Sequence, residues 1–291
     1  MSDVRCLWEA AAILGEGPLW SAREGALYWV DIKAPALHRY RPDDGDKTSW
    51  VMPERIGWVI ERANGEGLVA GFKQRGFAFL TPGTMMPETI GQPEPDYPDN
   101  RFNDAKADAE GRIWAGTMDD NEREATGSLY RLDADLDWHR MDKGYGITNG
   151  PAFSPDGRTL YHTDTAAGTI YAFDLTARGR LENKRVFVTI PEGDGYPDGM
   201  TCDAEGYLWV AHWGGWRITR FAPDGRVDRV VEMPVSQVTS CTFGGPDLDR
   251  LYITSAAIGL DEERLERQPL AGGLFEVVPG VKGLPAGLFA G

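Results

Sequence analysis

Four oxygen-bearing residues stand at one register of a recurring sequence pattern, where together they could hold a metal ion. In NDAKADAEG, NGPAFSPDG and DGMTCDAEG the first residue lies eight positions before a turn glycine, which relates Asn103, Asn149 and Asp198. EGPLWSAREG places Glu16 nine positions before its glycine, a difference that one extra turn residue explains. Each residue alone would more simply make a turn. Two carboxylates and two amides at matching register instead predict a site for Ca²⁺, Mg²⁺ or Mn²⁺ rather than a structural zinc.

Arg101 stands two residues before Asn103. On an extended strand both side chains point to the same face, so we expect a fixed cation beside the metal. A guanidinium there can donate to the hydroxyls of a polar substrate or to a developing carboxylate. The structural alternative is a salt bridge with Asp99 or Asp104.

Small residues at the equivalent position of other repeats would leave room for a ligand. That position falls at Gly57 or Trp58 in the second repeat and near Ser240 or Cys241 in the sixth. Trp58 and Tyr145 are candidates to flank the ring of a bound substrate, although a core position is an equally good interpretation of both.

Other catalytic centres are not indicated. The four histidines show no HxxxH or HExxH spacing, and no GxSxG elbow accompanies them. The three cysteines lack CxxC spacing, which argues against both a thiolate zinc site and a disulfide framework. Cys202 and Cys241 lie in apolar strand contexts, so we expect inert core residues.

The elements that must position these residues repeat six times along the chain, each as a turn, a short apolar strand, a gap and a second strand. The first strands are anchored on Leu27, Leu68, Ile113, Leu160, Leu208 and Leu251, with successive spacings of 41, 45, 47, 48 and 43 residues. Alternating strands with Asp-Gly and Glu-Gly turns are typical of hairpins. The repeats predict an all-β, six-bladed β-propeller over residues 1–291 as one domain, with a β-sandwich as the alternative.

The composition of the chain excludes some classes of binding partner. The formal net charge of −15 repels nucleic-acid phosphates and anionic lipid and attracts cations. No apolar run reaches transmembrane length, and the first residues are too acidic and too briefly apolar for a signal peptide. We therefore expect a cytoplasmic monomer or weak homo-oligomer that binds neither nucleic acid nor membrane and acts on a small molecule.

Six phrases resemble the senescence marker protein, gluconolactonase and luciferin-regenerating enzyme family of six-bladed propellers. They are LGEGPLW (14–20), RFNDAKAD (101–108), GRIWAGTM (111–118), TNGPAFSPDG (148–157), YPDGMTCDAEGYLWVA (196–211) and SCTFGGPDLDRLYIT (240–254). The resemblance covers nearly the whole chain. It implies hydrolysis of a sugar aldonolactone such as gluconolactone, xylonolactone or arabinonolactone.

The resemblance also assigns roles to residues. It implies one divalent metal ion held by Glu16, Asn149 and Asp198, with Ca²⁺ preferred over Zn²⁺, Mn²⁺, Mg²⁺ or Fe²⁺. Arg101 and Asn103 would contact the sugar lactone. In animal relatives an acidic residue after the GTM phrase helps to bind the sugar, and here that stretch offers Asp119, Asp120 and Asn121. Asp119 and Asn121 are the predicted substrate contacts.

Opening a lactone requires a polarised carbonyl and a delivered water, both of which a divalent metal can supply. Asp198 is the candidate general base, or it only orients the attacking water. Two other functions stay open: hydrolysis of phosphotriesters or other lactones on the same scaffold, and a regulatory metal-binding propeller without turnover. Fold alone does not separate them, because function depends on the site.

Overall fold

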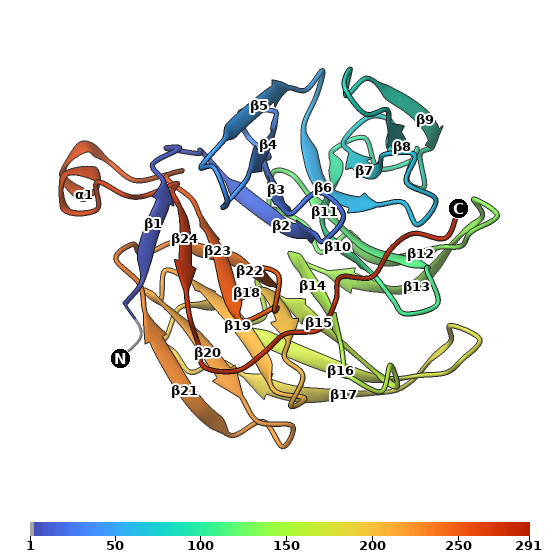
Figure 1. Ribbon diagram of the computed structural model, residues 1–291. Coiled ribbons are helices and arrows are strands. Elements are labelled where there is room, and N and C mark those ends of the chain that lie inside the picture. Colours follow the sequence, from blue (N-terminus) through green and yellow to red (C-terminus); the bar gives the residue numbers. More distant parts are fainter. Residues whose placement is uncertain (1–2) are drawn as a thin grey trace.

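Six four-stranded antiparallel sheets stand around a common centre in the computed structural model, which describes residues 3–291 (Figure 1). Over those residues the chain forms 24 strands and one short helix. The predicted six-bladed β-propeller is confirmed. All six anchor residues of the repeats lie in the second strand of their blades.

Five blades each use four consecutive strands, numbered outward from the centre. Blade 1 comprises β2 (Gly15–Ser21), β3 (Ala26–Asp31), β4 (Ala36–Tyr40) and β5 (Lys47–Val51). Blade 2 comprises β6 (Ile56–Glu61), β7 (Leu68–Phe72), β8 (Gly76–Leu80) and β9 (Pro87–Gly91). Blade 3 comprises β10 (Asn100–Ala107), β11 (Ile113–Asp119), β12 (Gly127–Leu132) and β13 (Trp138–Tyr145). Blade 4 comprises β14 (Thr148–Phe153), β15 (Thr159–Asp164), β16 (Thr169–Leu175) and β17 (Leu181–Thr189). Blade 5 comprises β18 (Tyr196–Cys202), β19 (Leu208–Trp213), β20 (Arg217–Phe221) and β21 (Val227–Glu232).

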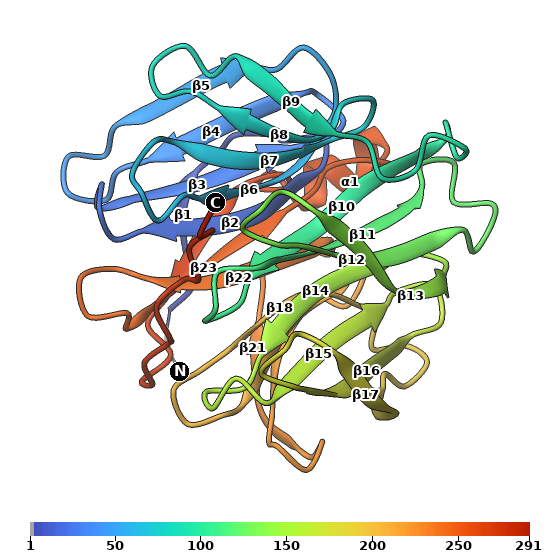
Figure 2. The ribbon, with the colours of Figure 1, turned by 90° about the vertical axis from the view of Figure 1, so that its right-hand side faces the viewer.

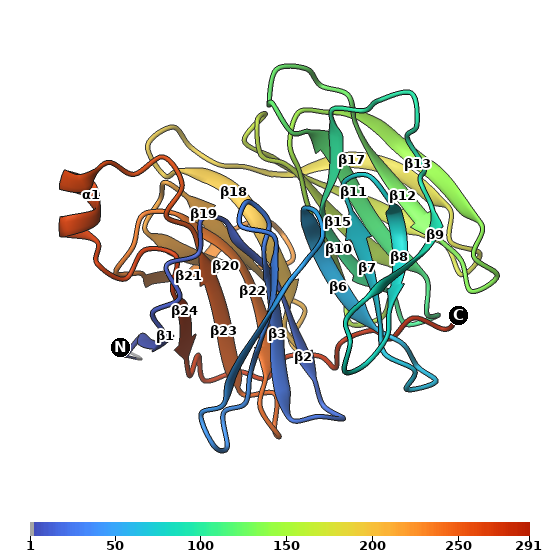
Figure 3. The same cartoon turned by 90° about the horizontal axis from the view of Figure 1, so that it is seen from above.

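The sixth blade joins the two ends of the chain. Its strands are β22 (Val238–Gly244), β23 (Arg250–Ser255), β24 (Leu274–Val277) and, outermost, β1 (Arg5–Trp8). β1 pairs antiparallel with β24, and Arg5 donates to Glu276 at 2.9 Å. The connection from β23 to β24 carries α1 (Glu262–Arg267), which stands outside the ring of sheets (Figure 3).

The hydrophobic core is divided among the interfaces between blades. Six clusters of buried apolar side chains occur, one for each pair of neighbouring blades. Trp29, Trp58, Trp114 and Trp209 are fully buried in them. Each blade therefore presents two apolar faces, and its burial depends on both neighbours.

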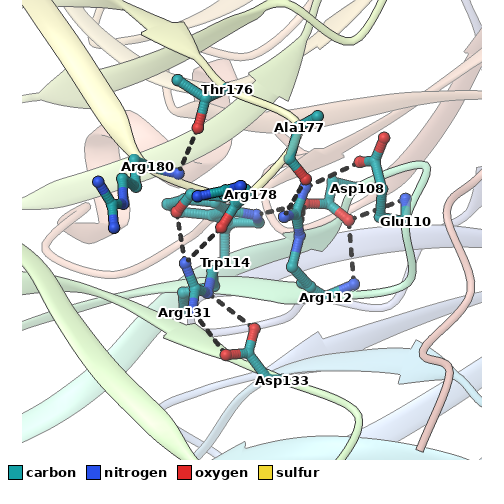
Figure 4. Close-up of polar contacts among 11 residues, drawn as sticks. Asp108, Glu110, Arg112, Trp114, Arg131, Asp133, Thr176, Ala177, Arg178 and Arg180 are labelled. Atoms are coloured by element: carbon teal, nitrogen blue, oxygen red, sulfur yellow. Dashed lines mark hydrogen bonds and ion pairs between the residues drawn. The ribbon is translucent and has the colours of Figure 1, made fainter.

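A polar cluster fastens blade 3 to blade 4 (Figure 4). Asp108 accepts from Trp114 Nε1 at 2.8 Å and from Arg112 Nε at 2.7 Å. Arg112 Nη1 in turn donates to the Ala177 carbonyl of the β16–β17 turn at 3.2 Å. In blade 5, Asp203 makes the same bond to Trp209. The Asp-Ala-Glu-Gly turns are thus structural, and they hold the inner strands in place.

The innermost strand of every blade has a bulge in its pairing with the second strand. The register shifts lie between Glu16 and Leu19, Ile56 and Trp58, Phe102 and Ala105, Asn149 and Ala152, Pro197 and Met200, and Val238 and Ser240. A bulge bends a strand and redirects its side chains. The four oxygen-bearing residues predicted from the repeats sit at the bulges of blades 1, 3, 4 and 5.

The C-terminal segment 281–291 crosses the opposite end of the ring, where the inner hairpins turn (Figures 1 and 2). Phe289 is fully buried there, and its backbone bonds to Glu61 and Ala63 of blade 2. Ala290 donates to the Gly111 carbonyl of blade 3. Between this segment and the inner strands lies a cavity of about 610 Å³. The tail therefore spans several blades at the end away from the bulges.

Candidate functional site

The residues predicted from the repeat register meet at one end of the channel. Glu16, Asn103, Asn149 and Asp198 lie on β2, β10, β14 and β18, near the starting ends of these inner strands, and all four are buried. Asn103 Nδ2 donates to Asn149 Oδ1 at 3.1 Å, which joins blades 3 and 4 directly. The structure thus brings together side chains that are 182 residues apart in sequence, from position 16 to position 198.

Backbone and hydroxyl partners fix the two amides. Asn103 Nδ2 also donates to the Thr148 carbonyl at 2.7 Å. Asn149 Nδ2 donates to Thr165 Oγ1 at 2.9 Å, and that hydroxyl donates to the Pro197 carbonyl at 2.7 Å. Because the nitrogen of Asn149 is held on the Thr165 side, its oxygen is presented on the opposite side with one lone pair still free.

Carboxyl groups are concentrated and buried at this end. Burial, together with the Asp104 carboxylate, raises the pKa of Glu16 to about 8. Burial, then Glu16 and Asp104, raises the pKa of Asp198 far above its ordinary range. Within residues 3–291 neither Glu16 nor Asp198 forms an ion pair with a basic side chain. A divalent cation is the kind of ligand that would stabilise both in their ionised forms.

Among residues 3–291, no three Asp, Glu, His or Cys side chains are grouped so that they could hold a metal by themselves. A cation held by Glu16 and Asp198 would therefore need a further oxygen, for which the amide of Asn149 is the candidate. An all-oxygen set of this kind suits a hard cation such as Ca²⁺ or Mg²⁺.

Asp104 is a neighbour that the repeat register did not single out. Its carboxylate accepts from the Gly150 backbone at 3.0 Å and from Ala105 at 2.8 Å, which ties the bulge of blade 3 to that of blade 4. Burial raises its pKa. The sequence RFNDAKAD shows a carboxylate directly after Asn103, but on a regular strand adjacent side chains point to opposite faces. The bulge between Phe102 and Ala105 breaks this alternation, so Asp104 lies on the side of Gly150.

In blades 2 and 6, the positions equivalent to Glu16, Asn103, Asn149 and Asp198 carry a glycine and a threonine whose hydroxyl bonds to the backbone. The bulge of blade 2 centres on Gly57, where an added Cβ would lie 2.7 Å from the Phe102 carbonyl oxygen. In blade 6 it centres on Thr239, one residue before Ser240 and two before Cys241, near which the position was predicted. Thr239 Oγ1 donates to the Gly15 carbonyl at 2.6 Å. The displacement by one residue is the expected effect of a bulge on register.

Arg101 is fully enclosed and points between the amides and a loop of its own blade. Its Nη1 donates to Asn103 Oδ1 at 2.5 Å, and its Nε donates to Asp120 Oδ1 at 2.8 Å. Asp120 is therefore its salt-bridge partner, and the alternative partners Asp99 and Asp104 are wrong. Burial lowers the pKa of Arg101 to about 10, so the guanidinium is charged at neutral pH.

The loop after β11 separates its three polar residues. Asp119 accepts from the backbone N–H groups of Asn121, Arg123 and Glu124 at 2.9 to 3.2 Å, and these bonds lower its pKa. The Asn121 side chain also bonds to Asp119. Asp119 and Asn121, the predicted substrate contacts, thus shape the loop, whereas Asp120 is the residue of this stretch that contacts Arg101.

Two aromatic candidates lie in the core. Trp58 packs against Phe77 and Phe102, and Tyr145 donates its hydroxyl to Asp142. Both side chains are fully buried, which favours the core interpretation of Trp58 and Tyr145 over contact with a substrate ring. Cys202 and Cys241 are buried with raised thiol pKa values, as expected of inert core residues.

Comparisons with known proteins place the chain among related sequences. Residues 14–257 match the family model described as "SMP-30/Gluconolactonase/LRE-like region". A 6-deoxy-6-sulfogluconolactonase of Pseudomonas putida is 35% identical over 99% of this chain and 99% of its own. An L-arabinolactonase of Azospirillum brasilense is 37% identical over 96% of this chain and 92% of its own.

A solved structure agrees in shape over nearly the whole length. The structure, described as a calcium-binding protein, regucalcin, from Agrobacterium tumefaciens, matches with a TM-score of 0.94 and 30% identity. The match covers 99% of this chain and 97% of that one. Taken with the propeller fold and the bulge residues, these matches establish that the chain belongs to the SMP-30/gluconolactonase/LRE-like family.

Proposed function

We propose that this protein is a metal-dependent lactonase that hydrolyses a sugar aldonolactone to the aldonic acid. The observation that supports the proposal is the pair of buried carboxylates, Glu16 and Asp198, each with a raised pKa and neither in an ion pair among residues 3–291, at the same bulge register as Asn149. The two relatives named as lactonases act, by name, on two different sugars. We extend lactone hydrolysis, but neither sugar, to this chain.

Glu16, Asn149 and Asp198 would hold the ion. When bound, a divalent cation supplies Lewis acidity, which polarises the lactone carbonyl and makes water more acidic. Asp198 would accept the proton of the attacking water, or orient that water. Asn103 and Arg101 hold the sugar: the Nε and Nη1 groups of Arg101 are engaged by the protein, which leaves Nη2 for a substrate hydroxyl or the new carboxylate.

The test is a pH-drop assay on a panel of pentono- and hexonolactones, corrected for spontaneous hydrolysis, with a phosphotriester as a further substrate. We expect lactone turnover that EDTA abolishes and that Ca²⁺, Mn²⁺, Mg²⁺ or Zn²⁺ restores. Asp198→Asn should lose both turnover and metal affinity, whereas Asp224→Asn, on an exposed turn, should keep both. Full activity in chelated protein would contradict the mechanism. Metal binding without turnover of any substrate would favour a regulatory propeller.

A further inference from the structure

Four cationic side chains converge on the single carboxylate of Asp120. Lys33 Nζ lies 2.9 Å and Arg101 Nε 2.8 Å from Oδ1, and Lys73 Nζ lies 2.9 Å from Oδ2. Arg55 Nη1 also contacts Oδ2. Among residues 3–291, Asp120 is the carboxylate with which each of the four forms an ion pair.

These groups come from three neighbouring blades at the end of the ring that carries the bulges. Lys33 follows β3, Arg55 directly precedes β6, and Lys73 follows β7. Arg101 lies on β10 and Asp120 follows β11. In antiparallel blades the start of the inner strand and the end of the second strand lie at the same edge. The cluster is therefore beside the proposed metal and substrate residues.

The charge balance of this cluster is opposite to that of the molecule. The chain has 30 Lys and Arg against 45 Asp and Glu. Elsewhere one guanidinium, Arg220, is shared by the carboxylates of Asp203, Glu205 and Asp228. At Asp120, four positive charges share one negative charge, so the contacts alone leave a local excess of three.

Further carboxyl groups act on the cluster from beyond ion-pair distance. Glu122 attracts Lys33 and Asp99 attracts Lys73, while Glu122, Glu16 and Asp198 attract Arg101. Burial and the charges of Arg101 and Arg55 still lower the pKa of Lys33 to about 8. Like charges repel, so an anion at this point would stabilise the arrangement.

The cluster is open to a ligand and continuous with the site. Side chains of Lys33, Lys73 and Arg55 are 16%, 22% and 37% exposed, whereas that of Arg101 is 3% exposed. Arg101 links the cluster to Asn103, which bonds to Asn149. One side chain therefore links the cluster to the residues proposed to bind the lactone.

We propose that Lys33, Arg55, Lys73 and Arg101 form a binding site for an anionic group carried by the sugar lactone at the end remote from its carbonyl. The inference rests on the proposed lactonase function and specifies its substrate class: a lactone bearing a phosphate, sulfonate or carboxylate. Lys33, Arg55 and Lys73 contact that anion, and Arg101 lies between it and the ring.

The kinetic test compares D-glucono-1,5-lactone with its 6-phosphate, its 6-sulfonate analogue and a glucarolactone, which carries a carboxylate. We expect a higher kcat/KM for at least one anionic lactone, and the three arms identify the anion. Lys73→Gln should lower the anionic-to-neutral ratio of kcat/KM about ten- to a hundredfold, the effect of one charge-assisted hydrogen bond. Arg55→Gln, which changes the most exposed of the four, serves if Lys73→Gln does not fold. The matched control is Lys184→Gln. This variant removes a lysine of β17 that pairs with Asp142 of β13.

A binding measurement separates this inference from the lactonase proposal. Calorimetry on metal-loaded protein compares 6-phosphogluconate with gluconate. We expect the phosphorylated acid to bind at least about tenfold more tightly, with the difference shrinking at high salt and in Lys73→Gln. If it does so while no lactone is hydrolysed, the anion site stands and the lactonase proposal fails. If neutral lactones are hydrolysed and no anionic compound is preferred in either assay, the anion site is overturned and the lactonase proposal stands.

Discussion

Arg101 is the side chain through which the carboxylate and amide site meets the cationic cluster. Its Nη1 bonds within the site and its Nε bonds to Asp120. Asp120 keeps three other cations if Arg101 is changed. The salt bridge therefore contributes less to stability than a buried ion pair usually does, because its loss leaves no unpaired charge behind.

This arrangement makes Arg101→Lys a functional rather than a structural change. Lys keeps the charge but lacks the planar fork, so kcat/KM should fall about ten- to a hundredfold with little change in melting temperature or metal affinity. The measurement is steady-state kinetics and thermal melting on the same preparation. Arg220→Lys, at an equally buried guanidinium held by three carboxylates of blade 5, is the control. It should lower the melting temperature and leave kcat/KM per folded molecule nearly unaltered. The reverse pattern for the two variants would remove Arg101 from the site.

At the scale of the element, the bulges of the inner strands place residues of the same repeat position together at one end of the channel. Glu16, Asn149 and Asp198 could be predicted together because each precedes a turn glycine at nearly constant spacing, and those glycines do have positive φ. The sequence left Trp58 undecided between core and site, because side-chain alternation breaks at the bulge; in the structure it packs in the interface between blades 2 and 3. Lys33, Lys73 and Asp120 do follow the second strands of blades 1, 2 and 3, and Lys33 and Lys73 lie 40 residues apart, close to the repeat length, but Arg55 precedes the inner strand of blade 2. Only the packing of blades 1, 2 and 3 side by side brings the four together.

The C-terminal segment is a second element whose role can be measured. Phe289 is fully buried among residues of blades 2 and 3. Phe289→Ala should destabilise the protein by about 3 to 5 kcal/mol, the usual effect of emptying an aromatic site. Denaturant unfolding measures this, with the half-exposed Val227→Ala as a control expected to change little. Turnover should be unaffected, since the segment crosses the end of the ring away from the bulges. Equal stability of the two variants would show that the tail is not part of the core.

For the whole molecule, the buried carboxylates link stability to pH. In metal-free protein the pKa of Glu16 is about 8, against 4.5 for an ordinary Glu. The folded state therefore binds more protons than the unfolded state between these values, and stability falls as pH rises through about 8. His162 acts in the opposite sense: burial lowers its pKa to about 3, so stability falls as pH drops below 6.5.

Between pH 6.5 and 8 the effect of Glu16 on stability can therefore be measured without that of His162. There the melting temperature of EDTA-treated protein should decrease as pH rises, and saturating Ca²⁺ should remove most of that slope because it stabilises the ionised carboxylates. Thermal melting at four pH values, with and without the ion, measures both effects. Glu16→Gln should flatten the EDTA series. A metal-free protein that becomes more stable toward pH 8 would refute the linkage.

The pairing of β1 with β24 has a consequence for the order of folding. Arg5 and Glu276 are 271 residues apart, so their contact closes nearly the longest loop that the chain allows. Such distant contacts slow folding, since loop-closure entropy must be overcome before they can form. On the ribosome, β1 emerges before the other strands of the propeller and stays unpaired until the other five blades and β24 have been synthesised. During that interval its exposed backbone groups can pair with another chain. We expect the yield of folded protein to depend on chaperones or slow synthesis more than the stability of the finished ring would indicate.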